Sequence, residues 1–379
     1  MDKVDTLISI NECHSAKERR AFERVPEVLH RGNPAFVPAF PFSIAKLLSP
    51  KSVFHRLHGT IRPFIACRGG RPVGRIAAII NRSHNEHHQD RVGFFGFFDC
   101  ENDAETADLL FSKLREVLHA EGMESIRGPY NPTINHECGL LLERFDKPPT
   151  LGLTWNPAYY RLHLERVGFK CARMLYGFNL PMNRLEIPER VSRIVERMKK
   201  RSALKIRPFD FQNMESELRI VRDVYNATLE RNWGFTPIAM EDMLATASEI
   251  RAIADPRILL IGESNGRPAG VALSLPNINE ILAAVRNTPL WLRLAHIFLL
   301  LKTRKVHRAR QTILGVVPEF RDRGLHAWLL HEQFRVAKLL HKEATLGWVE
   351  ESNTEVLQNC TLFGGEHDGQ WGIFEMAMG

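Results

Sequence analysis

Several common features are missing from this sequence of 379 residues. No apolar run reaches the roughly 18 residues that a helix needs to cross a bilayer. The six cysteines form no C-x-x-C pair and no zinc spacing, which is typical of reduced thiols in a cytoplasmic protein. The first residues include acids and no long apolar run, so we expect no signal peptide. The sequence also has no serine-hydrolase elbow, no Walker loop and no Rossmann glycine fingerprint.

The composition describes a globular protein with a basic surplus. Apolar residues make up 44% and charged residues 25% of the chain, as in soluble domains, and the length suits two domains. The net charge of +7 favours an anionic partner such as coenzyme A, an acidic lipid surface or nucleic acid. Three histidines, His84, His87 and His88, lie in a polar stretch that we interpret as a loop. We expect no metal site there or elsewhere.

One stretch of the second half predicts an anion-binding turn. Residues 312–317 have the pattern of a buried strand, Pro318 opens a turn, and an amphipathic helix follows Gly324. The first N–H groups of such a helix have no partner within it and lie at the positive end of the helix dipole, which favours pyrophosphate. Gly324 lets a phosphate approach the backbone, while Arg321 and Arg323 supply charged donors. An ordinary basic turn before a surface helix is the alternative interpretation.

The predicted elements around this turn follow a distinctive order. A hairpin at 257–275 is predicted by its Asn-Gly turn between apolar runs. After the turn and its helix come a strand at 345–350 and a short helix headed by Asn353. This order resembles the GNAT superfamily of acyl-CoA-dependent N-acyltransferases. The superfamily signature, Gln/Arg-x-x-Gly-x-Gly/Ala, matches at Arg321 and Gly324.

The resemblance implies a coenzyme A or acyl-CoA site with no metal. The signature departs at its sixth position, where His326 stands in place of Gly or Ala. The expected coenzyme-binding residues are Leu314, Gly315, Val316, Val317, Arg321, Asp322, Arg323, Gly324, Leu325, His326, Ala327 and Asn353.

Two matches between the halves of the chain indicate a duplicated fold. Residues 70–74 (GRPVG) recur as residues 266–270 (GRPAG), at an offset of 196. The twelve-residue spacing from Asn156 to a helix-closing glycine recurs after Asn353, at an offset of 197. Two matches at nearly one offset are the mark of an internal repeat.

We therefore predict an α/β fold with two tandem GNAT-like domains, residues 1–183 and 184–379. Each should be a central mixed sheet flanked by helices. Before its corresponding helix the first half carries Asp99, Glu101 and Asp103. Acids at a helix N-terminus stabilise the helix but repel pyrophosphate. We expect coenzyme A to bind only to the second domain.

Acyl transfer to an amine needs a general base, an oxyanion donor and an acid for the leaving thiolate. The resemblance places the oxyanion donor on the backbone of residues 314–317. We expect Glu350, at the end of a predicted neighbouring strand, to be the base, with Glu351 and Glu319 as competitors. The superfamily often has an acidic tyrosine near the end of its last helix, but Cys360 stands in that place. Cys360 is the candidate acid, and a buried core cysteine is the alternative.

The acceptor site is predicted in a loop between the first two helices of the second domain, where GNAT proteins usually place acceptor contacts. The loop contains Asn232, Trp233 and Phe235. A packed aromatic turn is the alternative. We also expect Asn277 in the LPNIN stretch to contact the substrate.

Residues 289–310 are unusual in a minimal GNAT domain. The segment is mostly apolar from Pro289 to Leu301 and contains Trp291 near its start. Five cations follow: Lys302, Arg304, Lys305, Arg308 and Arg310. This pattern fits an element that lies in an anionic membrane interface. A helix packed on the other domain, with a solvated basic tail, is the alternative. We expect peripheral contact with the inner membrane.

The chain as a whole resembles a bacterial family of tandem GNAT proteins. The resemblance includes GFFGFFD at 93–99, GPYNPTIN at 128–135 and NPAYY at 156–160. Members of this family have been linked to ceramide synthesis, which implies transfer of a long-chain acyl group from acyl-CoA to a sphingoid amine. Three alternatives stay open: acetylation of a small soluble amine, an inactive binding module, and aminoacyl transfer from tRNA. A nucleic-acid partner is not expected.

Overall fold

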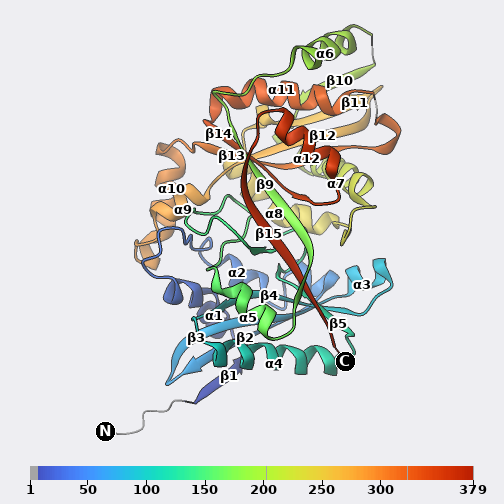
Figure 1. Cartoon of the computed structure of the whole chain (residues 1–379). Helices are drawn as coiled ribbons and strands as arrows, with labels where there is room; N and C mark the ends of the chain where they lie inside the picture. The colour runs from blue at the N-terminus through green and yellow to red at the C-terminus, as the bar shows by residue number, and fades with distance from the viewer. Residues whose placement is uncertain (1–6, 202, 322, 379) are drawn as a thin grey trace. The chain divides into compact units, whose positions relative to one another are not determined.

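The computed structural model describes residues 7–201, 203–321 and 323–378 of the chain (Figure 1). It divides into two compact units. Unit 1 comprises Met1–Leu175, Ile281–Leu300 and Gly369–Gly379, and unit 2 comprises Tyr176–Glu280 and Leu301–Asp368. Asp322, one of the predicted coenzyme-binding residues, lies outside the described residues.

Unit 1 contains most of the elements of the first half of the chain. In order they are β1 (Ile8–Glu12), α1 (Ala16–Leu29), α2 (Ser43–Leu47), the π-helical turn η1 (Phe54–His58), β2 (Gly59–Arg68), β3 (Arg71–Asn81), α3 (Arg82–His88), β4 (Val92–Cys100), α4 (Ala104–Ala120), β5 (Ser125–Gly128), β6 (Tyr130–Asn131), β7 (Glu137–Cys138), β8 (Leu140–Leu141), α5 (Tyr159–Arg166) and the first part of β9 (Lys170–Pro181).

The sheet of unit 1 has the strand order β1-β2-β3-β4-β5-β15, in which β15 is Glu366–Ala377. β4 and β5 are parallel and the other neighbours in this order are antiparallel. Strands β3 and β4 are buried along most of their length, as expected of the near-continuous apolar runs in their sequences. The core around them includes Phe95, Phe111 and Phe169, whose rings meet edge-on or tilted at 5.1 to 5.6 Å.

Unit 2 contains most of the elements of the second half. They are the end of β9, α6 (Glu189–Arg201), β10 (Leu204–Pro208), η2 (Phe211–Asn213), α7 (Met214–Leu229), α8 (Met240–Ile253), η3 (Pro256–Ile258), β11 (Leu259–Ser264), β12 (Arg267–Pro276), β13 (Arg308–Val316), η4 (Pro318–Phe320), α11 (Leu325–Leu340), β14 (Glu343–Glu350), α12 (Thr354–Leu362) and the start of β15. Two helices, α9 (Asn279–Ala284) and α10 (Leu290–Thr303), have residues in both units.

The sheet of unit 2 has the strand order β9-β14-β13-β12-β11-β10, with β13 and β14 parallel. Side chains alternate between its faces, as the pleat of a strand requires. Ala272 of β12 packs with Leu325 and Trp328 of α11, whereas its neighbour Val271 packs with Val221 of α7. The α7 and α11 helices therefore cover opposite faces of the sheet.

The predicted repeat is visible in the order of elements. Both β1 to β9 and β10 to β15 contain the series strand, two helices, three strands, helix, strand, helix, strand. Insertions interrupt it: α3 in the first repeat and α9 and α10 in the second precede the third of the three strands, and β6 to β8 precede α5. This confirms the prediction of a mixed α/β fold with two GNAT-like repeats. The units are not two consecutive halves divided at residue 183, however. Unit 1 also takes residues 281–300 and the end of β15, while β9 ends in unit 2.

Local sequence signals predicted the Asn265-Gly266 turn correctly, but they predicted a loop where the structure has helix α3. Asn265 and Gly266 join β11 to β12 with φ angles of 50° and 77°, as an Asn-Gly hairpin turn requires. The stretch with three histidines is not a polar loop but helix α3, because the Asn81 side chain accepts from the His84 N–H and caps it. His84 is buried.

Among the described helices, none combines the length and hydropathy needed to cross a membrane.

Candidate active site

The predicted coenzyme A site lies in unit 2, where β13 leads through η4 into α11 (Figure 1). Gly324 is the N-cap of α11 and has a φ of 80°, in the left-handed region that suits glycine. A Cβ added there would lie 2.8 Å from Sδ of Met198 on α6. The backbone conformation therefore favours glycine at this turn, and any side chain there would also displace Met198.

The start of α11 is open because Gly324 offers no side chain to cap it. Its first N–H groups have no acceptor within the helix, and the N–H of Trp328 donates back to the Gly324 carbonyl at 3.1 Å. Leu325 is buried and anchors the turn, whereas His326 is exposed and Ala327 half-buried. Together with the helix dipole, this backbone can bind a pyrophosphate.

The two arginines of the turn have different environments. Arg321 donates from Nη2 to the carbonyl of Thr228 at 3.1 Å and from Nε to the carbonyl of Val316 at 3.4 Å. It therefore ties the turn to the end of α7. Arg323 is exposed, with its guanidinium 5.3 Å from the centre of the Phe320 ring. Arg323 is the one better placed to meet a phosphate.

The backbone N–H groups of β13 point alternately toward β12 and toward the β14 side. The N–H of Val317 donates to the Ala269 carbonyl of β12 at 3.0 Å. Because N–H groups alternate in an antiparallel ladder, those of residues 313 and 315 also face β12, and those of Leu314 and Val316 face the β14 side. On that side the pairing of β13 with β14 runs from Arg308 and Glu343 to Gln311 and Leu346, although β13 continues to Val316. Within the described residues, the two parallel strands thus separate before the turn that leads into α11.

A side chain bridges the strands where they begin to separate. Arg310 donates from Nε to the Gly347 carbonyl of β14 at 3.0 Å. Thr312, the extra residue of a bulge against β12, donates its hydroxyl to the Leu273 carbonyl at 2.9 Å. Bulges commonly redirect a strand next to a functional site. Neither residue was predicted for the site, since each is recognised only by its partner on a neighbouring strand.

Thr228 was also missed by the sequence analysis. Its Oγ1 is buried and has no hydrogen-bond partner among the described residues. A Cβ added at Gly315 would lie 2.9 Å from this hydroxyl oxygen. Gly315 therefore lets α7 approach β13 closely, and no local sequence signal marks this contact.

The predicted catalytic carboxylates lie in different surroundings. Glu350 ends β14 and is half-buried, and its Oε2 accepts from both the N–H and the hydroxyl of Ser352. Glu351 is exposed, and Glu319 forms an exposed ion pair with Arg267 at 3.1 Å. Of the three, Glu350 lies on the strand that borders the open side of β13.

Cys360 does not fit the role of an acid. Its side chain is buried in a cluster with Phe178 and Phe334, and burial raises the pKa of its thiol to about 11. A thiol with this pKa is a poor proton donor to a leaving thiolate. We interpret Cys360 as a core residue, the alternative that the sequence had left open.

The remaining predicted residues lie in three places. The loop with Asn232, Trp233 and Phe235 follows α7 directly, so it emerges beside the Thr228 carbonyl that Arg321 contacts. Asn232 is exposed, whereas Phe235 is buried with its ring 6.4 Å from that of Tyr225.

Asn353 caps α12 by accepting from the N–H of Val356. Asn277 is buried and donates its N–H to the Arg308 carbonyl, at the opposite end of β13 from the turn. At about 3.3 Å per residue this is roughly 25 Å away.

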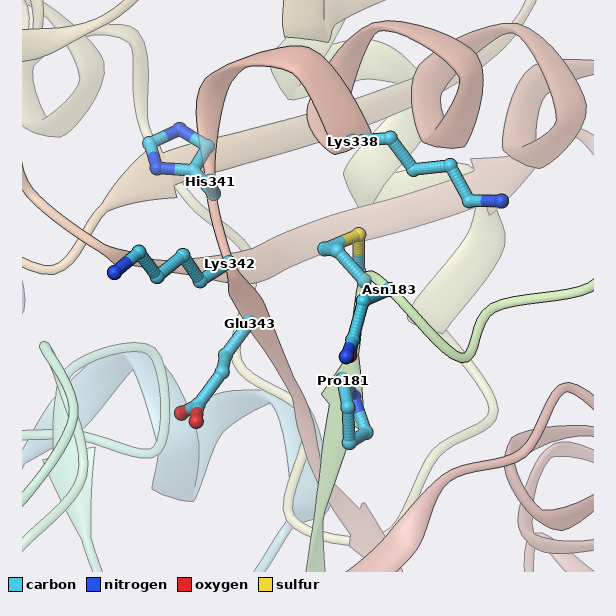
Figure 2. Close-up of a pocket in the computed structure, with 7 residues that line it drawn as sticks. Pro181, Asn183, Lys338, His341, Lys342 and Glu343 are labelled. Carbon is cyan, nitrogen blue, oxygen red and sulfur yellow. The ribbon is translucent and has the colours of Figure 1, made fainter.

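A cavity of about 440 Å³ lies elsewhere in unit 2, beyond the C-terminal end of α11 (Figure 2). Its lining includes Lys338, His341, Lys342 and Glu343. Figure 2 shows the ammonium groups of Lys338 and Lys342 pointing in different directions, and Lys338 donates to the Leu185 carbonyl. The cations do not converge on one ligand position, so we do not assign the active site to this cavity.

No group of three or more His, Cys, Asp or Glu side chains that could hold a metal ion occurs among residues 7–201, 203–321 and 323–378.

No protein-family model matches the chain. Two named proteins are similar to it in sequence. The protein "Bacterial ceramide synthase" of Caulobacter vibrioides is 28% identical over 383 aligned positions, covering 100% of this chain and 99% of that protein. "Protein YghO" of Escherichia coli is 26% identical, covering 94% and 92%.

Solved structures show the same fold. A tandem GNAT protein from the clavulanic acid biosynthesis pathway superposes with a TM-score of 0.59 at 10% identity, covering 98% of this chain and 99% of that one. A GCN5-related N-acetyltransferase from Sphaerobacter thermophilus gives a TM-score of 0.52 at 12% identity, covering 98% and 95%. The chain therefore has the tandem GNAT fold and is homologous over its full length to the protein named bacterial ceramide synthase.

Proposed function

We propose that the chain is an acyl-CoA-dependent N-acyltransferase whose coenzyme site is the start of α11. The tandem GNAT fold and the name of its full-length homologue support this class of activity. One observation carries the proposal: the α11 start, which has no side-chain cap, follows through η4 from the strand whose Leu314 and Val316 N–H groups face its open side.

The residues present fit coenzyme A. The first N–H groups of α11 would hold the pyrophosphate, with Arg323 as a charged donor and Gly324 allowing close approach. Coenzyme A, when bound, supplies the acyl group as a thioester. Arg321 keeps the turn in place through its bonds to the carbonyls of Thr228 and Val316.

The reaction would proceed by direct attack of the amine on the thioester carbonyl. A C–N bond forms, the C–S bond breaks, and the sulfur leaves with its electron pair. The N–H groups of Leu314 and Val316 are donors for the carbonyl oxygen, where negative charge develops. The amine must lose one proton, and we propose Glu350 as its acceptor, directly or through a water.

We further propose that the acceptor is a lipid-like amine, with a sphingoid amine as the best candidate, and that the donor carries a long acyl chain. The name of the homologue in Caulobacter supports this substrate class. The exposed apolar side of α10, described below, is a second and independent support. Acetylation of a small soluble amine is the competing activity.

Ala327 gives a sharp test of the coenzyme site. A glutamate at this third helical position suits the helix dipole, so Ala327→Glu should fold as well as the parent. Its carboxylate would nevertheless repel the pyrophosphate. We expect coenzyme A affinity, measured by calorimetry, to fall by about tenfold to a hundredfold.

Ala327→Gln is the matched control, because it has the same size without the charge. It should keep affinity within about threefold of the parent. Equal binding by both variants would show that the pyrophosphate does not lie at α11. Thiol release with palmitoyl-CoA and a sphingoid amine, compared with acetyl-CoA and a soluble amine, then tests the substrate class separately.

A further inference from the structure

Helix α10 (Leu290–Thr303) presents an unusual surface. Its exposed residues include Trp291, Leu292, Phe298 and Leu299, which are 80, 41, 55 and 58% exposed. At about 3.6 residues per turn, these positions lie on one side of the helix together with Ala295 and Lys302. The side of α10 that faces solvent is therefore largely apolar.

The opposite side of the helix is also largely apolar, with Leu290, Ile297 and Leu300, but it holds two polar side chains. Arg293 is only 5% exposed and forms a two-pronged ion pair with Glu27 of α1, with N–O distances of 2.7 and 3.0 Å. His296 bonds through Nδ1 to the Thr288 hydroxyl at 2.9 Å. Soluble amphipathic helices bury their apolar side and expose their polar side. In α10 the exposed side is apolar, and the buried side combines Ile297 with the ion-paired Arg293.

The polar contacts fix the rotation of the helix. Arg293 also donates to the carbonyls of Thr288 and Arg286, both at 3.3 Å, and Arg286 donates to the carbonyl of Pro34 at 2.9 Å. All of these groups belong to unit 1. Because turning the helix would break a buried ion pair, the apolar side is held outward.

Three exposed cations lie at and just after the C-terminal end of α10. Lys302, Arg304 and Lys305 are exposed and form no ion pair with any residue that the structure describes. The other two cations predicted for this surface do not belong to it. Arg308 pairs with Glu343 at 2.5 Å, and Arg310 bonds to the Gly347 carbonyl. The sequence prediction of five membrane-facing cations is thus corrected to three.

We propose that α10 and the cations after it dock the protein on an anionic lipid bilayer. The apolar residues would enter the acyl boundary, and the three cations would meet the acidic headgroups. The cations next to the apolar patch favour acidic lipid as the occupant over a second copy of this chain, which carries a net charge of +7. The proposal does not depend on catalytic activity.

The test is flotation of the purified full chain with vesicles. The parent should bind vesicles of phosphatidylglycerol and phosphatidylcholine in equal parts, bind less as salt is raised, and bind pure phosphatidylcholine weakly. The triple variant Lys302→Gln, Arg304→Gln and Lys305→Gln should lose about a hundredfold in partitioning, at about fivefold for each cation.

A second variant tests the apolar side. Trp291→Ser with Phe298→Ser changes only exposed side chains, so the variant should fold normally. It should lose about tenfold or more in partitioning. The double variant Leu339→Ser and Leu362→Ser, at exposed positions on other helices, is its control and should bind like the parent.

Helix α6 supplies the control for charge. The triple variant Arg190→Gln, Arg197→Gln and Lys200→Gln removes three exposed cations from a helix whose Val195 is fully buried. If the α6 and α10 triple variants lose binding equally, general basicity explains the binding and the proposal fails. It also fails if the parent ignores anionic vesicles, or if the apolar variant changes only the oligomeric state.

Discussion

The two units present the same turn with opposite chemistry. In unit 1 Gly74 of β3 lies opposite Cys100 of β4, and in unit 2 Gly270 of β12 lies opposite Val316 of β13. The two glycines match in the sequence repeat. The segments that follow, leading into α4 and α11, therefore occupy equivalent places in one fold, although the segment before α11 is longer.

In unit 1 this turn is satisfied by its own side chains. Asp103 accepts from the N–H of Thr106 at 3.0 Å and caps α4. Arg68 donates to Glu101 at 2.5 Å and to Asp103 at 2.6 Å, and Arg71 donates to Glu101 at 2.8 Å. Both the helix start and the acids are already paired. A pyrophosphate would meet the capping carboxylate of Asp103 and two arginines that are already paired with acids.

A second difference lies one residue earlier. Asp99 of unit 1 stands opposite Arg75, which donates from Nε to it at 2.7 Å, and His30 and Tyr160 contact the same carboxylate at 3.2 and 3.3 Å.

In unit 2 the equivalent pair is Gly315 and Val271. At this place unit 1 has a buried ionic network around Asp99. Unit 2 has Gly315 there, next to the Thr228 hydroxyl. The comparison teaches that the turn before this helix can be occupied by side chains of the same unit, as in unit 1. In unit 2 the same turn has no side-chain cap.

The largest effect should come from breaking the buried network of unit 1. Arg75→Met leaves the Asp99 carboxylate buried without its guanidinium, and we expect a loss of about 3–5 kcal/mol in the free energy of unfolding. Urea unfolding at neutral pH measures it. Arg91→Met removes the exposed Arg91–Glu124 pair and should cost at most about 1 kcal/mol. Similar losses in both variants would mean that the network is not a stabilising core.

A smaller effect should come from filling the glycine of unit 2. Gly315→Ala places a Cβ within 3.3 Å of three Thr228 side-chain atoms and should cost about 1–3 kcal/mol through overpacking. Thr228→Ala removes two of those atoms, so the double variant should recover most of the loss. An additive double-mutant cycle would show that the two residues are not in contact.

The smallest effect concerns acid sensitivity of the turn in unit 1. Burial alone would raise the pKa of Asp103, but hydrogen bonds from Thr106 and Arg68 bring it from 3.8 to about 2. A folded-state pKa below the unfolded value stabilises the protein above about pH 4, and this stabilisation is lost as the pH falls toward 2.

Arg68→Gln should weaken this part of the pH dependence. Because the carboxylate is partly exposed, we expect a difference of less than about 1 kcal/mol. The unfolding midpoint of each protein, followed between pH 5 and pH 3, provides the measurement. Parallel pH profiles for parent and variant would assign the acid sensitivity to another carboxylate.

The sequence predicted what depends on neighbouring residues. The Asn265-Gly266 hairpin, the Asn353 cap and the strand–turn–helix around Gly324 were all predicted from signals within a few positions of each other. The sequence could not show that Arg308 and Arg310 are used inside the sheet, because their partners lie 35 and 37 positions away. Thr228 and Gly315 meet across the face of the sheet and leave no periodic pattern. The burial of Cys360 could not be predicted from nearby residues either, since it depends on Phe334 of another helix.

Strand β15 has a consequence for how the chain is made. Phe374 lies opposite Gly128, and Glu375 pairs with Arg127 at 3.1 Å, so the sheet of unit 1 gains a strand synthesised about 250 residues later. Until that strand arrives, β5 is an exposed edge that could pair with other nascent chains. Such non-local pairing also slows folding. Residues 1–183 expressed alone would lack this strand, and we expect that fragment to aggregate more readily than the full chain.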